Sequence, residues 1–209
     1  MTTIETAELT RSDGSKVPCS IVHGWNLRAS LECDTMWKKA SLELLNFIME
    51  QNYNEKELVE VVSSISMEDD HWKWFDKAML LSSERYEWFH LYAENKPQAA
   101  CVIYHPKKSA LAAGDIFYVE FVAVAPWNRR CKIREREFRP VGKILLRAAL
   151  RFAVTTLKLR PGFCLHSLSG ATKSYRDLNL VNVPGLDKDD LPYFELPPDL
   201  AETFMKEAN

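Results

Sequence analysis

One acidic side chain, Glu120, interrupts the otherwise apolar and aromatic run from Ile116 to Ala125. The run is rich in β-branched and aromatic residues, which predicts a strand. A carboxylate on such a strand needs either a partner or a function. Alternation along the strand would put Glu120 on the same face as Val122 and Val124. Glu120 is therefore a candidate general base, and the alternative is a structural glutamate held in a salt bridge.

A second predicted strand, Phe163–Leu168, contains His166 and Cys164. Because imidazole titrates near neutral pH, His166 is a second candidate for proton transfer. The alternative, a hydrogen-bonded histidine in the core, is the more common outcome for such a residue. Cys164 has the chemistry of a nucleophile, but a lone cysteine on a strand usually serves as a small hydrophobic side chain.

The turn from Arg139 to Ile144 precedes a long helical pattern and contains Gly142. The first N–H groups of a helix have no intrahelical partner, and the helix dipole adds positive potential there. Glycine lets an anion approach the backbone closely, so this turn has the features of a pyrophosphate site. Taken alone, the pattern also fits a glycine that merely eases the start of a helix.

Three helices are predicted before residue 85. Asp34 is the expected N-cap of the first helix, and Asn54 with Glu57 forms a capping box for the second. The acidic run Glu68–Asp70 is expected to open the third. Apolar residues at helical spacing suggest the buried faces. These are Trp37, Ala40, Leu44, Phe47 and Ile48 in the first, Leu58, Val61, Val62 and Ile65 in the second, and Trp72, Phe75 and Met79 in the third.

From residue 85 the pattern alternates between strands and helices. Up to residue 33, only the stretch 17–22 suggests a strand. The remaining expected elements are a hairpin of 85–93 and 98–104, a strand at 116–125, a helix from 142, a strand at 163–168, a helix at 171–178, a strand at 191–196 and a helix from Asp199. This order predicts an α/β (α+β) fold with one mixed sheet and a strand–helix–strand crossover at 116–168. Ligands bind such sheets where strands diverge.

The strand ending Phe121–Pro126, the R-x-x-G turn and the leucine-rich helix that follows together resemble the central motif of the GNAT superfamily of N-acetyltransferases. The resemblance implies a mostly antiparallel sheet, flanked by helices, in which one parallel strand pair splays apart to hold acetyl-CoA. It also implies that the main chain of Val122, Ala123 and Val124 contacts the pantetheine arm.

In that family the turn binds the pyrophosphate. By resemblance, the N–H groups would come from Val141, Gly142, Lys143 and Ile144, with charge added by Arg139. Ile144 stands where the family usually has a small residue. The basic loop 127–140 is an insertion. It is either a clamp for the 3′-phosphate of CoA, because arginine matches phosphate geometry, or a solvated loop.

The segment Leu165–Tyr175 places Ala171 and Tyr175 four residues apart, as in the short helix of many GNAT enzymes. The resemblance makes Tyr175 the general acid near the CoA sulfur. Asn179 stands where glycine is common, and asparagine tolerates the same left-handed backbone. The segments 125–129 and 191–196 extend the resemblance, which covers 85–205.

Residues 1–84 carry no recognised motif. A single domain, 1–209, is expected, in which 85–205 form the cofactor-binding core and 1–84 supply a first strand and helices on the acceptor side. The implied reaction is direct acetyl transfer from acetyl-CoA to a primary amine, on a small molecule or a protein, with Glu120 or His166 as base. The alternative is a non-catalytic GNAT module that binds CoA or a partner protein.

The composition of the chain bears on its expected binding partners and its expected cellular compartment. The 209 residues carry 27 basic and 29 acidic side chains, a net charge of −2, which gives no general attraction to nucleic acid or an anionic membrane. The five cysteines form no CxxC pair, so reduced thiols and no metal site are expected. No run of 18 apolar residues and no signal peptide is evident, which favours the cytoplasm. An exposed sheet edge would allow a homodimer.

Overall fold

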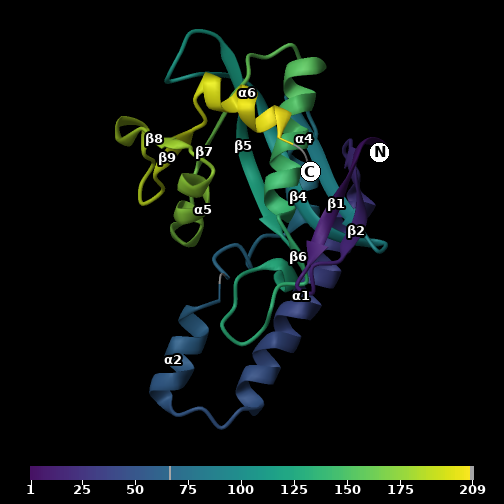
Figure 1. The fold of residues 1–209 in the computed structure, drawn as a ribbon, viewed down its shortest axis with the longest axis vertical. Coiled ribbons are helices and arrows are strands. Elements are labelled where there is room, and N and C mark those ends of the chain that lie inside the picture. Colours follow the sequence, from purple (N-terminus) through teal and green to yellow (C-terminus); the bar gives the residue numbers. More distant parts are fainter. Residues whose placement is uncertain (66, 208–209) are drawn as a thin grey trace.

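A mixed sheet runs through the computed structural model, which describes residues 1–65 and 67–207, and helices lie on both of its faces (Figure 1). The strands are β1 (Thr2–Arg11), β2 (Lys16–His23), β3 (Tyr86–Ala93), β4 (Lys96–Lys108), β5 (Asp115–Val124), β6 (Phe138–Arg139), β7 (Phe163–His166), β8 (Val181–Asn182) and β9 (Tyr193–Glu195). The helices are α1 (Leu27–Glu50), α2 (Glu55–Ser63), α3 (Trp74–Leu80), α4 (Val141–Thr155), α5 (Thr172–Asp177) and α6 (Pro198–Lys206).

The strand order is β6-β1-β2-β3-β4-β5-β7-β9-β8. Neighbouring strands within the described residues are antiparallel except β5 and β7, which are parallel and joined through α4. A crossover helix is what a parallel neighbour requires. The predicted fold class, a mostly antiparallel sheet with one parallel pair flanked by helices, is confirmed.

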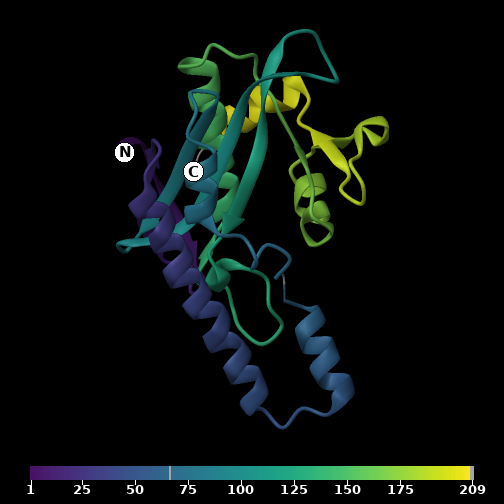
Figure 2. The same cartoon turned by 180° about the vertical axis from the view of Figure 1, so that it is seen from behind.

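Two cores cover the two faces of the sheet. The larger packs α4 and α6 against the sheet around Phe89, Phe117 and Leu145. The smaller packs α1 and α3 on the other face around Trp37, Trp74 and other side chains. Seen from the two sides, α1 and α2 extend beyond the end of the sheet as an arm (Figures 1 and 2).

The start of α1 differs from the prediction. The helix begins at Leu27, and the N-cap is Asn26, whose side chain accepts the N–H of Ala29 at 2.9 Å. Asp34 lies inside α1, so its prediction as N-cap is wrong. Its carboxylate instead accepts the N–H groups of Trp74 and Phe75, at 2.7 and 2.8 Å. Asp34 thus satisfies the first donors of α3, a helix 40 residues away.

The third helix begins at Trp74 and not at the acidic run 68–70. Its buried residues are Trp74 and Ala78, whereas the predicted Met79 is 56% exposed. The capping box of Asn54 and Glu57 on α2 is confirmed. Strand β1 lies in a polar segment that shows no strand pattern in the sequence. It forms a strand because its neighbours β2 and β6 supply its hydrogen bonds.

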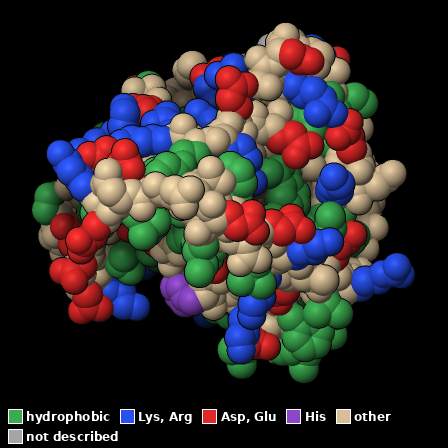
Figure 3. Space-filling model, turned by 90° about the horizontal axis from the view of Figure 1, so that it is seen from below, with side chains coloured by type: hydrophobic (Ala, Val, Ile, Leu, Met, Phe, Trp, Pro, Cys, Tyr) green, Lys and Arg blue, Asp and Glu red, His purple; other side chains and the backbone are tan. Residues whose placement is uncertain are grey.

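The outer part of the arm is less buried than its pattern predicts. Only Val61 of the stripe on α2 is buried, and Leu58, Val62 and Phe47 are exposed. Figure 3, seen from below, shows hydrophobic side chains at the surface among groups of acidic and basic ones. The helical periodicity is real, but few other elements reach this arm to cover it.

Two turns have the backbone that their residues favour. Glu94 and Asn95, which join β3 to β4, have φ values of 52° and 58°, as a two-residue hairpin turn requires. Asn179, after α5, has φ 63°, so its predicted left-handed conformation is confirmed.

Candidate active site

Strands β5 and β7 separate soon after they meet. They pair only at Phe117↔Phe163 and Tyr118↔Cys164, and beyond these pairs β5 continues beside β4 alone. A cavity of about 550 Å³ opens at the divergence. Its walls include residues 119–124 of β5, 138–143 before and within α4, 165–166 of β7 and 173–175 of α5. The fold therefore brings the candidate residues, with the exception of Ile144, to one cavity, although they span 56 positions, from Glu120 to Tyr175.

A bulge in β5 lies at Glu120. The pairing with β4 shifts register between Val102 and Ile103, whose partners are Phe121 and Val119, so Glu120 has no partner on β4. A bulge adds one residue to a strand and locally breaks its alternation.

This bulge overturns the predicted orientation of Glu120. Before it, Phe117 and Val119 belong to the α4 side; after it, Val122 and Val124 pack on that same side. Phe121 packs on the α1 and α3 side. The charges felt by Glu120 include Lys77 of α3, so Glu120 does not share the face of Val122 and Val124.

Glu120 is half-buried among both charged and aromatic groups. Burial raises the pKa of its carboxyl group, and the positive charges of Lys188, Lys77 and His166 counteract this rise. Its negative charge in turn contributes to raising the pKa of Tyr118, to about 12, behind the larger effect of burial. A carboxylate with a raised pKa, next to a cavity, is suited to accept a proton.

Both ring nitrogens of His166 have partners. Nε2 lies 2.9 Å from the carbonyl oxygen of Leu186, and Nδ1 lies 2.8 Å from the hydroxyl of Tyr118. Because a carbonyl can only accept, Nε2 donates to Leu186, while the Tyr118 hydroxyl, which can donate or accept, bonds to Nδ1. His166 therefore reaches the cavity as part of a hydrogen-bonded chain.

Tyr175 lines the cavity from α5 and packs against the main core. Its ring centre is 6.4 Å from that of Phe194. Burial raises the pKa of its hydroxyl well above the ordinary value, so Tyr175 stays protonated at neutral pH. A protonated hydroxyl at a cavity wall can donate to a leaving group.

The turn before α4 offers backbone donors to the same cavity. Helix α4 begins at Val141, and the first intrahelical bond found here runs from the Ile144 N–H to the Pro140 carbonyl, at 3.1 Å. The N–H groups of Val141, Gly142 and Lys143 precede that bond. The first turn holds no acidic residue. The Ile144 N–H is used by that bond, so three N–H groups of the four expected from the sequence lack an intrahelical acceptor.

Gly142 packs closely on β5. A Cβ atom added at Gly142 would meet Cγ1 of Val124 at 3.4 Å, which is ordinary contact. A methyl group would fit there, whereas a larger side chain would have to displace Val124. The first turn of α4 and the end of β5 thus form one corner of the cavity.

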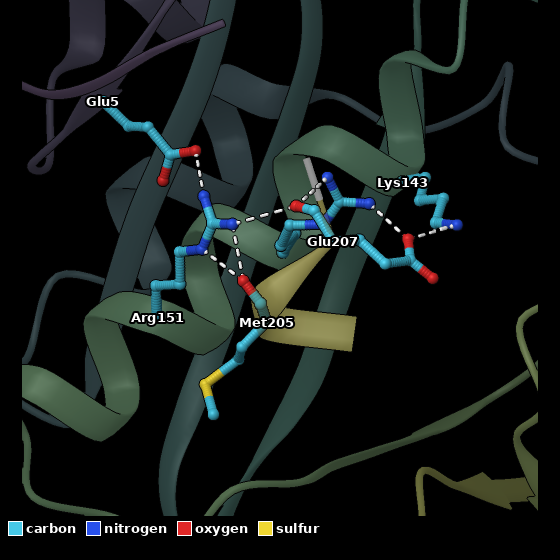
Figure 4. Close-up of polar contacts among 6 residues, drawn as sticks. Glu5, Lys143, Arg151, Met205 and Glu207 are labelled. Carbon is cyan, nitrogen blue, oxygen red and sulfur yellow. Dashed lines mark hydrogen bonds and ion pairs between the residues drawn. The ribbon is translucent and has the colours of Figure 1, made fainter. Parts of the chain in front are cut away.

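Lys143 is held by the C-terminal segment (Figure 4). Its Nζ lies 2.6 Å from Oε2 of Glu207, which also accepts from Arg147 at 2.7 Å. The hydrogen bond with Lys143 is the main cause of the lowered pKa of Glu207. Arg151 joins the same network through the carbonyl oxygen of Met205 and the carboxylate of Glu5.

Basic side chains flank the turn. Arg139 is exposed, and Arg130 and Arg136 also reach the main cavity. A second hollow of about 470 Å³ lies beside it and is lined by Ser12, Arg139 and residues 130–136. Burial and the charges of Arg130 and Arg139 lower the pKa of Arg136, which places these guanidinium groups close together.

The segment 67–72 crosses to the cavity from the N-terminal part of the chain. Asp69 accepts two hydrogen bonds from Arg129, at 2.7 and 2.9 Å, and Arg129 also donates to the Val124 carbonyl at 3.0 Å. Glu68 accepts the N–H of Gly170 at 2.9 Å. The segment is thereby tied to both β5 and the loop before α5.

Sequence reasoning missed two residues of this region. The ring of Trp72 meets that of Phe121 edge-on at 5.0 Å, and Nζ of Lys77 lies 3.3 Å from the centre of the Phe121 ring. Trp72 was interpreted only as packing. Lys77 has no sequence signal, because its place depends on how α3 docks.

Comparison with known structures agrees with this topology. An uncharacterised protein from Bacillus halodurans (bh2621) superposes with a TM-score of 0.52 over 98% of this chain and 96% of its own, at 9% identity. The chain shares the fold of that protein. A Mycobacterium smegmatis RimJ in complex with CoA-disulfide gives a TM-score of 0.49 at 12% identity over 95% and 92% of the two chains. A putative GNAT-family acetyltransferase from Desulfovibrio desulfuricans gives 0.47 at 9% identity over 85% and 98%.

No protein-family model matches the sequence, and no curated protein matches it. Across residues 1–65 and 67–207, no helix is both long and apolar enough to cross a membrane. The same residues contain no group of three or more His, Cys, Asp or Glu side chains placed to hold a metal ion.

Proposed function

We propose that this protein is an N-acetyltransferase that moves an acetyl group directly from acetyl-CoA to a primary amine. One observation carries the proposal: the cavity between the diverging strands β5 and β7 joins three helix-start N–H groups to a half-buried carboxylate and a protonated tyrosine. The first feature suits an anionic cosubstrate, and the other two suit proton transfer.

The cofactor half of the site consists of backbone and basic groups. Val122, Ala123 and Val124 would hold the pantetheine arm through their main chain, since β4 pairs with only one edge of β5 here. The N–H groups at 141–143 would bind the pyrophosphate, with charge from Arg139. Ile144 contributes packing to this half. The residues present therefore fit acetyl-CoA.

The acceptor half lies on the face of Glu120. An alkylamine has a pKa near ~10, so it must lose a proton before it can attack a carbonyl carbon. Glu120 would take that proton. His166, with Nε2 held by the Leu186 carbonyl, would hold Tyr118 in position through Nδ1. Tyr175 would protonate the departing sulfur.

The N-terminal region would supply the acceptor side. Residues 1–84 contribute α1, α3 and the segment 67–72, which approaches Glu120 and Phe121. The same arrangement supports one domain rather than two, because β1 and β2 belong to the common sheet.

A second candidate function is a non-catalytic module that binds CoA. The ion pair between Lys143 and Glu207 favours it, because a carboxylate then competes for a cation of the phosphate turn. The two functions differ in the fate of the Tyr175→Phe variant, which loses turnover only in an enzyme.

Calorimetric titration with acetyl-CoA, desulfo-CoA and adenosine 3′,5′-bisphosphate tests the cofactor site. Gly142→Ala should bind nearly as the wild type does, because its methyl group fits against Val124. Gly142→Val should bind at least about tenfold more weakly, a cost of about 1.4 kcal/mol. Absence of binding to the wild type would contradict the proposal, as would equal binding by both variants.

A further inference from the structure

Lys77 places a primary amine against the strand that carries Glu120. Its ammonium lies 3.3 Å from the centre of the Phe121 ring and 4.9 Å from the Trp72 ring. Both rings line the cavity, as does Glu120. Aromatic faces hold an alkylammonium well, so Lys77 is positioned as an amine substrate would be.

Other lysines near the cavity are held differently. Lys143 is paired with Glu207 at 2.6 Å, and Lys173 with Asp177 at 3.0 Å. Both ammonium groups are therefore engaged by a carboxylate. Lys188 influences Glu120 from an exposed loop. Lys143 also lies 5.8 Å from the centre of the Phe204 ring, but among these four lysines Lys77 is the one whose ammonium lies over two rings that line the cavity.

The environment of Lys77 also favours the reactive form of an amine. Burial lowers the pKa of its ammonium group, and this effect outweighs the opposing charges of Glu120 and Asp34. A larger fraction of Lys77 is thus neutral at a given pH than for a solvated lysine. An amine that belongs to the same chain also removes the entropy cost of binding a second molecule.

We propose that Lys77 is a site of self-acetylation, at which one acetyl group passes from acetyl-CoA to Nζ within the same chain. The inference rests on the proposed function. Nζ forms a bond to the thioester carbonyl carbon while the carbon–sulfur bond breaks. Glu120 takes the proton lost by the amine, and Tyr175 gives a proton to the thiolate. The proton that Glu120 gains balances the proton that Tyr175 loses, so the neutral amine and acetyl-CoA give an acetyl-lysine and free CoA with no net change in protons. The proton that the Lys77 ammonium loses beforehand goes to solvent, and no further reactant is needed.

The test is mass spectrometry of the full chain after incubation with isotope-labelled acetyl-CoA. One label per chain is expected on Lys77, with a first-order rate that does not change with protein concentration. Lys73 is the matched control, because it lies four residues earlier and its side chain is 74% exposed. The Glu120→Gln variant should label Lys77 about 10²-fold more slowly, with the background at Lys73 unchanged. Lys77→Arg should remove the label while keeping the charge and the ring contact.

A second measurement needs no acetyl-CoA. Trace labelling with acetic anhydride across a pH series should modify Lys77 at lower pH than a lysine in a short model peptide. If labelling of Lys77 began only at the pH at which the lysine of the model peptide is labelled, the proposal would be overturned. So would equal rates at Lys77, Lys73 and Lys188, or a rate proportional to protein concentration.

The two proposals fail in distinguishable ways. If calorimetry shows that acetyl-CoA binds and an added amine is acetylated while Lys77 stays unmodified, self-acetylation is overturned and the proposed function stands. If acetyl-CoA does not bind, both are overturned.

Discussion

The ion pair of Asp69 and Arg129 connects the segment 67–72 to strand β5, and breaking this pair should destabilise the fold. The two side chains are only 14% and 10% exposed, and they share two hydrogen bonds. Burial raises the pKa of Asp69 despite the nearby Arg129, so desolvation costs more than the attraction returns. The net contribution of the pair to stability is therefore small, but a buried guanidinium that has lost its countercharge would cost more.

Asp69→Asn keeps the shape of the side chain and removes its charge. The expected loss is about 3 kcal/mol, the lower end for breaking a buried pair. For a domain of this size that corresponds to a fall in Tm of about 6–12 °C. Urea unfolding followed by tryptophan fluorescence gives the free energy directly. The control is Asp76→Asn, whose partner Lys73 is exposed, with an expected change below about 1 kcal/mol.

Replacing both Asp69 and Arg129 separates the cost of an uncompensated buried charge from the cost of altered packing. The double variant Asp69→Leu/Arg129→Met should be more stable than Asp69→Asn, because no buried charge remains. It should not regain wild-type stability fully, since Arg129 also donates to the Val124 carbonyl. An Asp69→Asn protein within about 1 kcal/mol of the wild type would refute the reasoning, because it would mean that water solvates Arg129.

Three further predictions concern the site. Tyr175→Phe should lower kcat about 10²-fold with unchanged CoA affinity, measured by thiol release and calorimetry; unchanged kcat would remove its role as acid. Because Glu120 must be ionised to act, kcat/KM should rise with pH through its raised pKa. Lys188→Met removes a charge that lowers this pKa, so the acidic limb should move to higher pH; an unmoved limb would exclude Glu120 as base. Glu207→Gln should free Lys143 and tighten adenosine 3′,5′-bisphosphate binding about threefold by calorimetry, whereas weaker binding would contradict competition between them.

The sequence predicted correctly those features of the backbone that are determined by residues close together in the chain. The capping box at Asn54, the hairpin that follows residue 85 and the left-handed Asn179 each depend on a few neighbouring residues, and each is confirmed, with the hairpin turn two residues shorter than expected. The prediction failed where a partner lies far away. Asp34 was interpreted as a cap for its own helix, but its carboxylate caps α3 instead.

The candidate site was predictable in part for the same reason. The turn before α4 and the strand 116–125 carry a motif, so their meeting at one cavity could be expected. The bulge at Glu120 could not be expected, because a register shift depends on how β5 pairs with β4. Alternation alone places the Glu120 side chain on the face of Val122 and Val124. Lys77 was missed because its position depends on the docking of α3.

The bulge has a consequence for how the site divides its tasks. Val122 and Val124 pack toward α4, whereas Phe121 packs toward α1 and α3. The charge of Lys77, a residue of α3, lowers the pKa of Glu120. Under the proposed function, β5 would thus present a cofactor side to the motif-bearing half of the chain and an acceptor side to residues 1–84. Acceptor choice should then follow α3 and the segment 67–72, and substitutions there should change KM for the amine without changing the affinity for CoA. That separation explains why the sequence indicates acetyl-CoA but leaves the amine unnamed.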